Sequence, residues 1–340
     1  MIRDTAGLIA AGLARPDQSA ALEAVGERYA VAITPAMQAL IEAPDDTIAR
    51  QFVPDLAELH SAPHEAADPI GDEAHSPLPG LVHRYPDRVL IKPLLACPVY
   101  CRFCFRREHV GLGGGTLTPD QLDAAYRYVE ERPAIREVIL TGGDPLMLSP
   151  RRLRAMLDRL EAIPHVELLR IHSRVPVAEP SRATPALALA LDREKPLWLA
   201  VHANHASEFS AEAVAALSRL HAAGVLLLGQ SVLLRGVNDS AEALEALFRA
   251  MLRARVKPYY LHQLDPAPGT ARFAVPIEEG RRLLAALRGR VTGLAWPTYV
   301  LDIPGGHGKV PIGPDYLDFA GTVRDPWGWP HALAGSEAAV

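Results

Sequence analysis

The sequence predicts an α/β protein, a partial TIM-like (β/α) barrel with a helical N-terminal cap and a short C-terminal tail. From residue 89 onward, short strand-like runs alternate with helical patterns. Repeated βα units of this kind predict a parallel sheet. The chain has 340 residues, of which 49% are hydrophobic, and this is enough for one large α/β domain with appendages.

The predicted elements divide the chain into three parts. Residues 1–82 are rich in alanine and proline and are expected to form irregular helices with a loop at 61–79. Residues 83–318 are expected to form the barrel, and residues 319–340 a tail that is mobile after Pro330. Strands are expected at 89–95, 136–140, 166–171, 197–201, 225–228, 258–261 and 298–303. Helical patterns between them include 119–131, 211–223 and 241–253.

Composition excludes several classes of protein. The formal charge is −5, and without a basic surplus we expect no nucleic-acid partner. The sequence contains no run of 18 apolar residues, so we expect no membrane-spanning helix. The apolar patch at 8–13 follows Asp4 and leads to no small-residue cleavage site, so we expect no signal peptide. Free clustered thiols fit a reducing compartment, and we expect a cytoplasmic protein.

Three cysteines, Cys97, Cys101 and Cys104 in CPVYCRFC, are the whole supply of the chain. A disulfide framework needs an even number, and structural zinc sites or electron-carrying iron–sulfur centres need four ligands. Three thiolates can hold a four-iron cluster and leave one iron open to a substrate. The C-x3-C-x2-C spacing resembles that of radical S-adenosylmethionine (SAM) enzymes. Two alternatives stay open: a zinc site with His109 as fourth ligand, and buried inert thiols.

Lysine chemistry is confined to four residues, because 31 of the 35 basic residues are arginine. Lys309 ends the glycine-rich segment GGHGK directly after a predicted strand, whereas Lys92, Lys195 and Lys257 lie in or before strands. The segment lacks the Ser or Thr and the following helix of a nucleotide-binding P-loop. Small residues around a lone amine leave room for a Schiff-base aldehyde such as pyridoxal 5′-phosphate (PLP). A solvated surface lysine is the alternative.

Polar residues stand at the ends of the predicted strands, where a parallel barrel gathers its functional groups. Gly142 and Gly143 are expected to bring backbone amides close to a ligand, and Asp144 to accept from a ligand ammonium. Each residue could instead be a cap or a satisfied core group. The strand ends supply Thr141, Gly142, Gly143, Asp144, His172, Ser173, Arg174, His202, Asn204, His205, Gln230, His262, Gln263, Asp265 and Asp302.

Ordered motifs from about residue 83 to residue 312 resemble the lysine 2,3-aminomutases, which are radical SAM enzymes that also carry PLP. The motifs are HRYPDRVL, CPVYCRFCFRRE, TGGDPL, HSRVPV, LGQSVLLRGVND, PYYLHQLD and VLDIPGGHGK. The resemblance implies that Cys97, Cys101 and Cys104 bind a [4Fe-4S] cluster whose open iron takes SAM. It implies a SAM site lined by Gly142, Gly143, Asp144, His202 and Gln230. It also implies PLP on Lys309, cradled by Arg84, Tyr85 and Arg88.

The same resemblance implies the substrate and the reaction. Arg106 would pair with the substrate carboxylate, and Asp265 and Asp302 with the distal ammonium of lysine. A 5′-deoxyadenosyl radical would take a hydrogen from C3, and the amino group would migrate from C2 to C3 to give β-lysine. A reductant such as flavodoxin or ferredoxin and a homodimeric assembly are the expected partners.

Other outcomes stay open at the level of sequence. Clostridial-type members extend past the barrel with extra zinc-binding cysteines that this chain lacks. Its length resembles the short branch that supplies (R)-β-lysine for elongation factor P, whereas the glycine loop with Asp302 resembles the long form. An aminomutase for arginine or glutamate is an alternative, and a non-catalytic metal-binding or electron-transfer protein is a more distant one.

Overall fold

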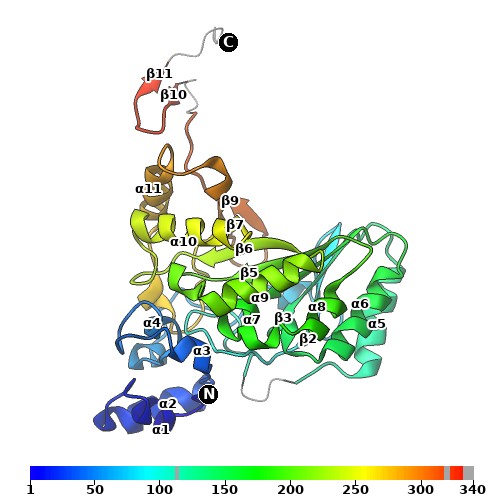
Figure 1. Ribbon diagram of the computed structural model, residues 1–340, viewed down its shortest axis with the longest axis horizontal. Helices are drawn as coiled ribbons and strands as arrows, with labels where there is room; N and C mark the ends of the chain where they lie inside the picture. Colours follow the sequence, from blue (N-terminus) through cyan, green and yellow to red (C-terminus); the bar gives the residue numbers. More distant parts are fainter. Residues whose placement is uncertain (112–114, 318–321, 332–340) are drawn as a thin grey trace.

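A curved nine-stranded sheet forms the centre of the protein in a computed structural model that describes residues 1–111, 115–317 and 322–331 (Figure 1). The strands lie in sequence order from β1 to β9. Strands β2 to β8 are parallel, and β1 and β9 are antiparallel at the two edges. Their bounds are β1 Leu81–Tyr85, β2 Arg88–Leu94, β3 Glu137–Gly142, β4 Leu168–Ser173, β5 Leu197–His202, β6 Leu226–Val232, β7 Lys257–His262, β8 Thr298–Asp302 and β9 Lys309–Pro311.

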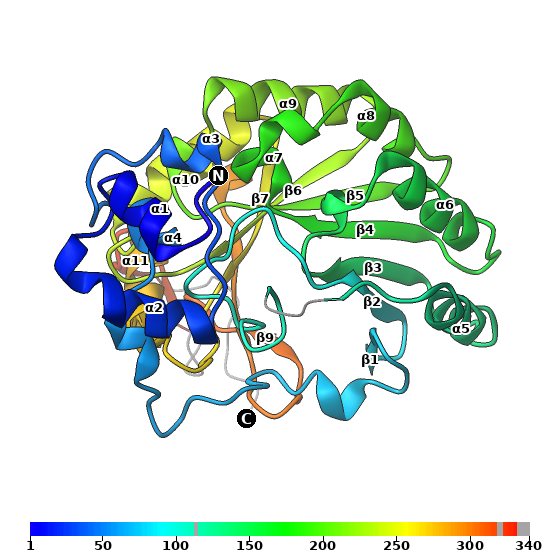
Figure 2. The same ribbon diagram turned by 90° about the horizontal axis from the view of Figure 1, so that it is seen from below.

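Helices cover the outer face of this sheet, as Figure 2 shows. Helix α5 illustrates how they form: the Thr118 hydroxyl accepts from the Gln121 amide, and Pro119 occupies the first turn. Its buried residues recur at helical spacing on one face. The covering helices are α5 Pro119–Glu130, α6 Pro150–Glu161, α8 Pro185–Leu191, α9 Ala211–Ala222, α10 Ala241–Arg253 and α11 Ile277–Leu287. Between β4 and α8 the chain forms the short α7 Val175–Ala178.

The topology confirms the predicted partial barrel. Within the described residues β1 and β9 do not pair with each other, so the sheet is open at that side. The predicted strands match β2 to β8 to within two residues in most cases. The antiparallel edge strands β1 and β9 were missed, because each is short and each pairs with one neighbour only.

The missed strand β9 changes the interpretation of the glycine-rich segment. That segment is the turn of a β8–β9 hairpin, and Lys309 is the first residue of β9 rather than a loop residue. In the hairpin register Asp302 and Lys309 are direct cross-strand partners. Gly305, Gly306 and Gly308 all have positive φ, a backbone region that favours glycine, and they allow the chain to reverse here.

The N-terminal helices form a cap with a small core of its own. They are α1 Thr5–Ala10, α2 Ser19–Arg28, α3 Pro35–Gln38 and α4 Ala49–Phe52. Leu8, Met37 and Phe52 belong to this core, together with Val99 of the cysteine segment. The cap therefore packs directly on the segment that carries the cysteines.

The C-terminal tail is described only in part. Strands β10 Val323–Arg324 and β11 Pro330–His331 form a separate two-stranded sheet. The sequence predicted mobility after Pro330, and residues 332–340 of this segment lie outside the described part of the chain. The division at residues 82 and 318 stays a prediction. None of the helices in the described part combines the length and the apolarity needed to cross a bilayer.

Candidate active site

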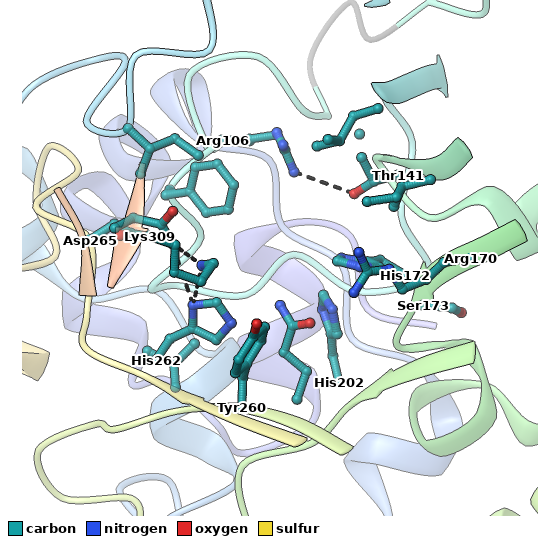
Figure 3. Close-up of a pocket in the computed structure, with 18 of the residues that line it drawn as sticks. Arg106, Thr141, Arg170, His172, Ser173, His202, Tyr260, His262, Asp265 and Lys309 are labelled. Atoms are coloured by element: carbon teal, nitrogen blue, oxygen red, sulfur yellow. Dashed lines mark hydrogen bonds and ion pairs between the residues drawn. The ribbon is translucent and has the colours of Figure 1, made fainter. Parts of the chain in front are cut away.

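One cavity of about 870 Å³ opens inside the curved sheet. It is lined along β2 to β8 and by segments that follow their carboxyl ends, the side where a parallel barrel carries its chemistry. Figure 3 shows side chains from several strands pointing into it, among them His172, His202, His262 and Lys309. Every residue that the family resemblance assigned to the site lines this cavity, whereas the strand-end residues His205 and Gln263 do not. The fold therefore brings together residues that are more than 200 positions apart.

The cysteine segment crosses one wall of the cavity after β2. Cys97, Cys101 and Cys104 all line it. The segment is tied to the cap by a hydrogen bond of 2.8 Å from the Arg102 amide to the Gln51 carbonyl. It is tied to the barrel by a bond of 2.9 Å from the Asp144 amide to the Ala96 carbonyl. This wall can hold a cluster with one face toward the cavity.

The zinc alternative gains no support from the described residues. No three His, Cys, Asp or Glu side chains among them are grouped closely enough to bind a single metal ion. The His109 ring lies near the surface with its Nε2 3.8 Å from a Glu73 carboxylate oxygen. A four-iron cluster is larger than one ion and takes thiolates that stand farther apart.

A buried carboxylate fastens the cysteine segment from behind. Glu58 is fully buried and accepts hydrogen bonds from Arg102, Arg107 and Arg272. Burial would raise the pKa of Glu58, but the positive charge of Arg102 and the other two guanidinium groups lowers it. No local sequence pattern indicates this network, because its members come from three distant segments.

The polar groups of the TGGD turn have hydrogen-bond partners within the protein. The Gly143 amide donates to the Leu94 carbonyl at 2.8 Å. The Asp144 carboxylate accepts from the Ser173 hydroxyl at 2.8 Å and from the Arg174 amide at 2.7 Å. A Cβ at Gly143 would lie 2.5 Å from the Ala96 carbonyl oxygen. Gly143 therefore permits close packing against the cysteine segment. A role of Gly143 in binding SAM stays a prediction.

Lys309 lies beside a carboxylate and an imidazole. Its Nζ donates to an Asp302 oxygen and lies 3.2 Å from His262 Nδ1. Its backbone amide donates to the Tyr85 hydroxyl at 2.7 Å. Burial opposes ionisation of Asp302, but hydrogen bonds and charge from His262 and Lys309 hold its pKa below the ordinary value. Asp302 thus pairs with the amine of Lys309 in this structure.

Asp265 is the second carboxylate of this region, and it has the opposite character. Burial, reinforced by the negative charge of Asp302, raises its pKa to about 7. Its Oδ1 is buried and has no hydrogen-bond partner among the described residues. A cationic ligand group beside Asp265 would remove both penalties.

Arg84 and Arg106 are joined by Asp72, a residue that the sequence analysis did not single out. Arg106 Nη2 lies 2.9 Å from Asp72 Oδ2, and Arg84 Nη2 lies 3.2 Å from Asp72 Oδ1. Burial would raise the pKa of Asp72, but the charge of Arg106 and neighbouring cations lowers it. Asp72 belongs to the 61–79 loop of the cap, and only the tertiary fold brings it to the barrel.

The remaining predicted residues lie in two parts of the sheet, at β1 and β2 and at β5 and β6. Tyr85 and Arg88 flank the strand β1 to β2 turn, with the Arg88 guanidinium 3.8 Å from the Tyr85 ring centroid. His202 and Gln230 are neighbours across β5 and β6. The His172 and His202 rings meet edge to face at 5.6 Å. Burial and the Arg174 charge lower the pKa of His202 to about 3, so this ring is neutral at physiological pH.

Comparison with known proteins identifies the family. Residues 91–248 match the family model of the Radical SAM superfamily, and residues 284–322 match the family model described as Lysine-2,3-aminomutase. L-lysine 2,3-aminomutase of Fusobacterium nucleatum is 42% identical over 293 residues, which cover 86% of this chain and 69% of the relative. L-lysine 2,3-aminomutase of Acetoanaerobium sticklandii is 41% identical over 304 residues, which cover 89% and 73%. The chain belongs to the lysine 2,3-aminomutase family.

The aminomutase family also includes relatives with another named substrate. Glutamate 2,3-aminomutase of Clostridioides difficile is 35% identical over 303 residues, covering 88% of this chain and 72% of the relative. Family membership makes the chain a radical SAM enzyme of the isomerase class. It also implies a [4Fe-4S] cluster, SAM and PLP as cofactors.

The residues present fit these cofactors of the aminomutase family. Several buried polar atoms that line the cavity have no partner among the described residues, and buried polar groups are normally hydrogen-bonded. They are Arg84 Nε, Arg106 Nε, Arg170 Nε, His172 Nε2, Arg174 Nε, His202 Nε2, His262 Nε2 and Asp265 Oδ1. The four arginine nitrogens are donors, which suits anionic phosphate and carboxylate groups. The three thiols and the Lys309 amine supply the other attachment points.

Proposed function

We propose that this enzyme converts L-lysine to β-lysine by 2,3-amino migration that starts from a 5′-deoxyadenosyl radical. The observation that carries the proposal is that Cys97, Cys101, Cys104, Arg106, Asp265, Asp302 and Lys309 line one and the same cavity. When bound, the cluster and SAM would supply the hydrogen-abstracting radical, and PLP the π-bond across which the nitrogen moves. The protein would supply orientation and exclusion of water.

The charges in the cavity support a substrate with a carboxylate at one end and a cation at the other. Arg106 offers a guanidinium that faces the cavity from the cysteine segment. Asp265 and Asp302 offer two carboxylates near the carboxyl ends of β7 and β8. Two carboxylates that share one region repel each other unless a cation lies between them. Lysine meets both demands, whereas the distal carboxylate of glutamate would add a third negative charge.

Lys309 is the proposed attachment point for PLP, with Arg84, Tyr85 and Arg88 around it. The hydrogen bond from the Lys309 backbone amide to the Tyr85 hydroxyl fixes the start of β9. Asp302 and His262 hold the Lys309 amine while it is free. With PLP attached to Lys309, this amine would no longer be the ammonium partner of Asp302, and the carboxylate would be available to the substrate ammonium.

We also propose the reductant, the oligomeric state and the location of the enzyme. A one-electron protein reductant such as flavodoxin or ferredoxin would reduce the cluster, and the enzyme would act as a homodimer in the cytoplasm. The three free thiols on the cavity wall support a reducing location.

The decisive experiment is an anaerobic assay of the reconstituted enzyme with lysine, arginine and glutamate in parallel. We expect turnover of lysine to exceed that of glutamate by at least about a hundredfold, since removing a charge-assisted contact and adding repulsion each disfavour glutamate. Chiral chromatography of the product distinguishes (R)- from (S)-β-lysine and thus the short branch from the long form. Faster turnover of glutamate or arginine would overturn the substrate assignment, and a colourless zinc-loaded protein would overturn the enzyme class.

A further inference from the structure

Arg174 contacts a cysteine of the proposed cluster site although it is not a ligand. It follows directly after β4, and its Nη1 lies 3.3 Å from Cys101 Sγ. This distance is within the range of an N–H to sulfur hydrogen bond. Among the described residues, Cys101 Sγ is the acceptor that Nη1 meets. The contact joins the sulfur to a permanent positive charge.

The Arg174 side chain is held in this orientation from its other side. Its Nη2 donates to Glu208 Oε2 at 2.6 Å and to Gln51 Oε1 at 2.7 Å. The rings of Phe52 and Phe103 lie within 5.7 Å of the guanidinium carbon. The residue is only 6% exposed. Because so many contacts fix the guanidinium, the bond to Cys101 cannot be lost by a simple rotation of the side chain.

Burial strengthens the electrostatic effect of the contact between Arg174 and Cys101. Arg174 and Glu208 are both buried, so their fields are screened far less than those of surface charges. The potential of an iron–sulfur cluster depends on hydrogen bonds to its sulfurs and on nearby charge. A reduced cluster carries one more negative charge than the oxidised cluster. A fixed cationic donor at a ligand sulfur therefore favours the reduced state.

We propose that Arg174 is a positioning residue that raises the reduction potential of the cluster by donating a hydrogen bond to the thiolate of Cys101. The inference rests on the proposed function, because it requires the three cysteines to bind the cluster. The redox step is a one-electron reduction of the cluster by an external donor, dithionite or a reduced flavodoxin or ferredoxin. No bond forms or breaks at Arg174, which keeps its proton throughout.

The test is a reductive titration of the reconstituted protein in which the paramagnetic signal of the reduced cluster is followed. The variant is R174Q combined with E208Q, because removing Arg174 alone would leave the buried Glu208 charge unpaired. Gln at 208 keeps an oxygen for the Asn204 and His205 amides, which Glu208 Oε1 accepts at 2.7 and 2.9 Å. We expect about a tenfold lower ratio of reduced to oxidised cluster at a fixed potential, which equals about 59 mV for a one-electron couple.

The same strand offers a matched control. Arg170 of β4 pairs with Glu137 at 2.9 Å, lines the same cavity and contacts no cysteine in the described structure. The R170Q and E137Q double variant removes an equivalent ion pair and should leave the potential close to that of the parent protein. An equal shift in both double variants would assign the effect to general electrostatics and overturn the role of the sulfur contact.

A second measurement needs no variant and covers the case in which the double variant does not fold. Pulsed electron paramagnetic resonance of the reduced cluster in protein labelled with 15N in the arginine guanidinium should detect coupling to one such nitrogen. Absence of this coupling overturns the inference. If the unaltered protein binds no four-iron cluster, the proposed function fails instead; if it does and the potential is unchanged in R174Q/E208Q, only the inference about Arg174 fails.

Discussion

Asp265 and Asp302 should respond in opposite directions to the same chemical change. In the protein without ligands, ionised Asp265 is penalised by burial and by Asp302, and its pKa is raised from 3.8 to about 7. A difference of roughly three between the folded and the ordinary pKa corresponds to about 4 kcal/mol. This is an upper limit for the gain in folding free energy when Asp265→Asn removes the charge, because the site is coupled to Asp302 and Lys309.

The sign of the effect depends on pH. Below about pH 4 the Asp265 carboxyl is protonated in both the folded and the unfolded protein. Between about pH 4 and pH 7 only the unfolded chain ionises, so the contribution of Asp265 to folding stability is lost as the pH rises. Asp265→Asn should therefore unfold like the parent protein at about pH 4, and should gain up to about 4 kcal/mol at pH 8.

Asp302→Asn is the matched comparison. In the parent protein, His262 and Lys309 lower the pKa of the Asp302 carboxyl against the effect of burial. The contribution of Asp302 to folding stability is therefore present above about pH 4 and is lost as the pH falls. This variant should be less stable than the parent at pH 8, since Lys309 loses its counterion. The assay is urea unfolding of both variants and the parent without cofactors at several pH values.

The Asp265→Asn variant should lose catalytic efficiency although it gains folding stability. The amide cannot supply a charge-assisted hydrogen bond to the lysine ammonium, a contact of about 1.5 to 3 kcal/mol, so we expect roughly a tenfold or greater loss of kcat/KM. A variant at Asp265 that gains no stability between pH 5 and pH 8 would refute the electrostatic reasoning. Unchanged lysine kinetics in both variants, with cluster and PLP loaded, would refute the substrate pocket.

Three further predictions concern the other parts of the site. Cys104→Ala should abolish iron binding and SAM cleavage, because no fourth cysteine exists to replace it; measured iron content and full activity equal to those of the parent would contradict the cluster site. Borohydride reduction should fix PLP on Lys309, as mass spectrometry of the digest can establish; an adduct on Lys92, Lys195 or Lys257 would be the contrary result. Asp72→Asn should lower kcat/KM about tenfold by releasing Arg84 and Arg106 from their shared carboxylate, whereas the adjacent and mostly exposed Glu73→Gln should have little effect; equal effects of the two would argue against a positioning role.

Local pattern was sufficient for much of the fold. The alternation of strand and helix patterns predicted the parallel strands β2 to β8, because periodicity and βα order depend on neighbours in the chain. The spacing of Cys97, Cys101 and Cys104 depends on one short segment and was equally readable. The edge strands were not, since β1 and β9 have little pattern of their own and are defined by a single pairing partner.

Composition and spacing establish which chemical groups this protein has: three thiols, one lysine after a glycine-rich turn, and polar residues at strand ends. Folding of the whole chain sets how these groups are paired. It set Lys309 opposite Asp302, brought Asp72 from the cap to Arg84 and Arg106, and set Arg174 against Cys101. Such pairings depend on register, burial and contacts between distant segments, and these are fixed only when the whole chain packs, whereas composition and spacing are fixed in the chain itself.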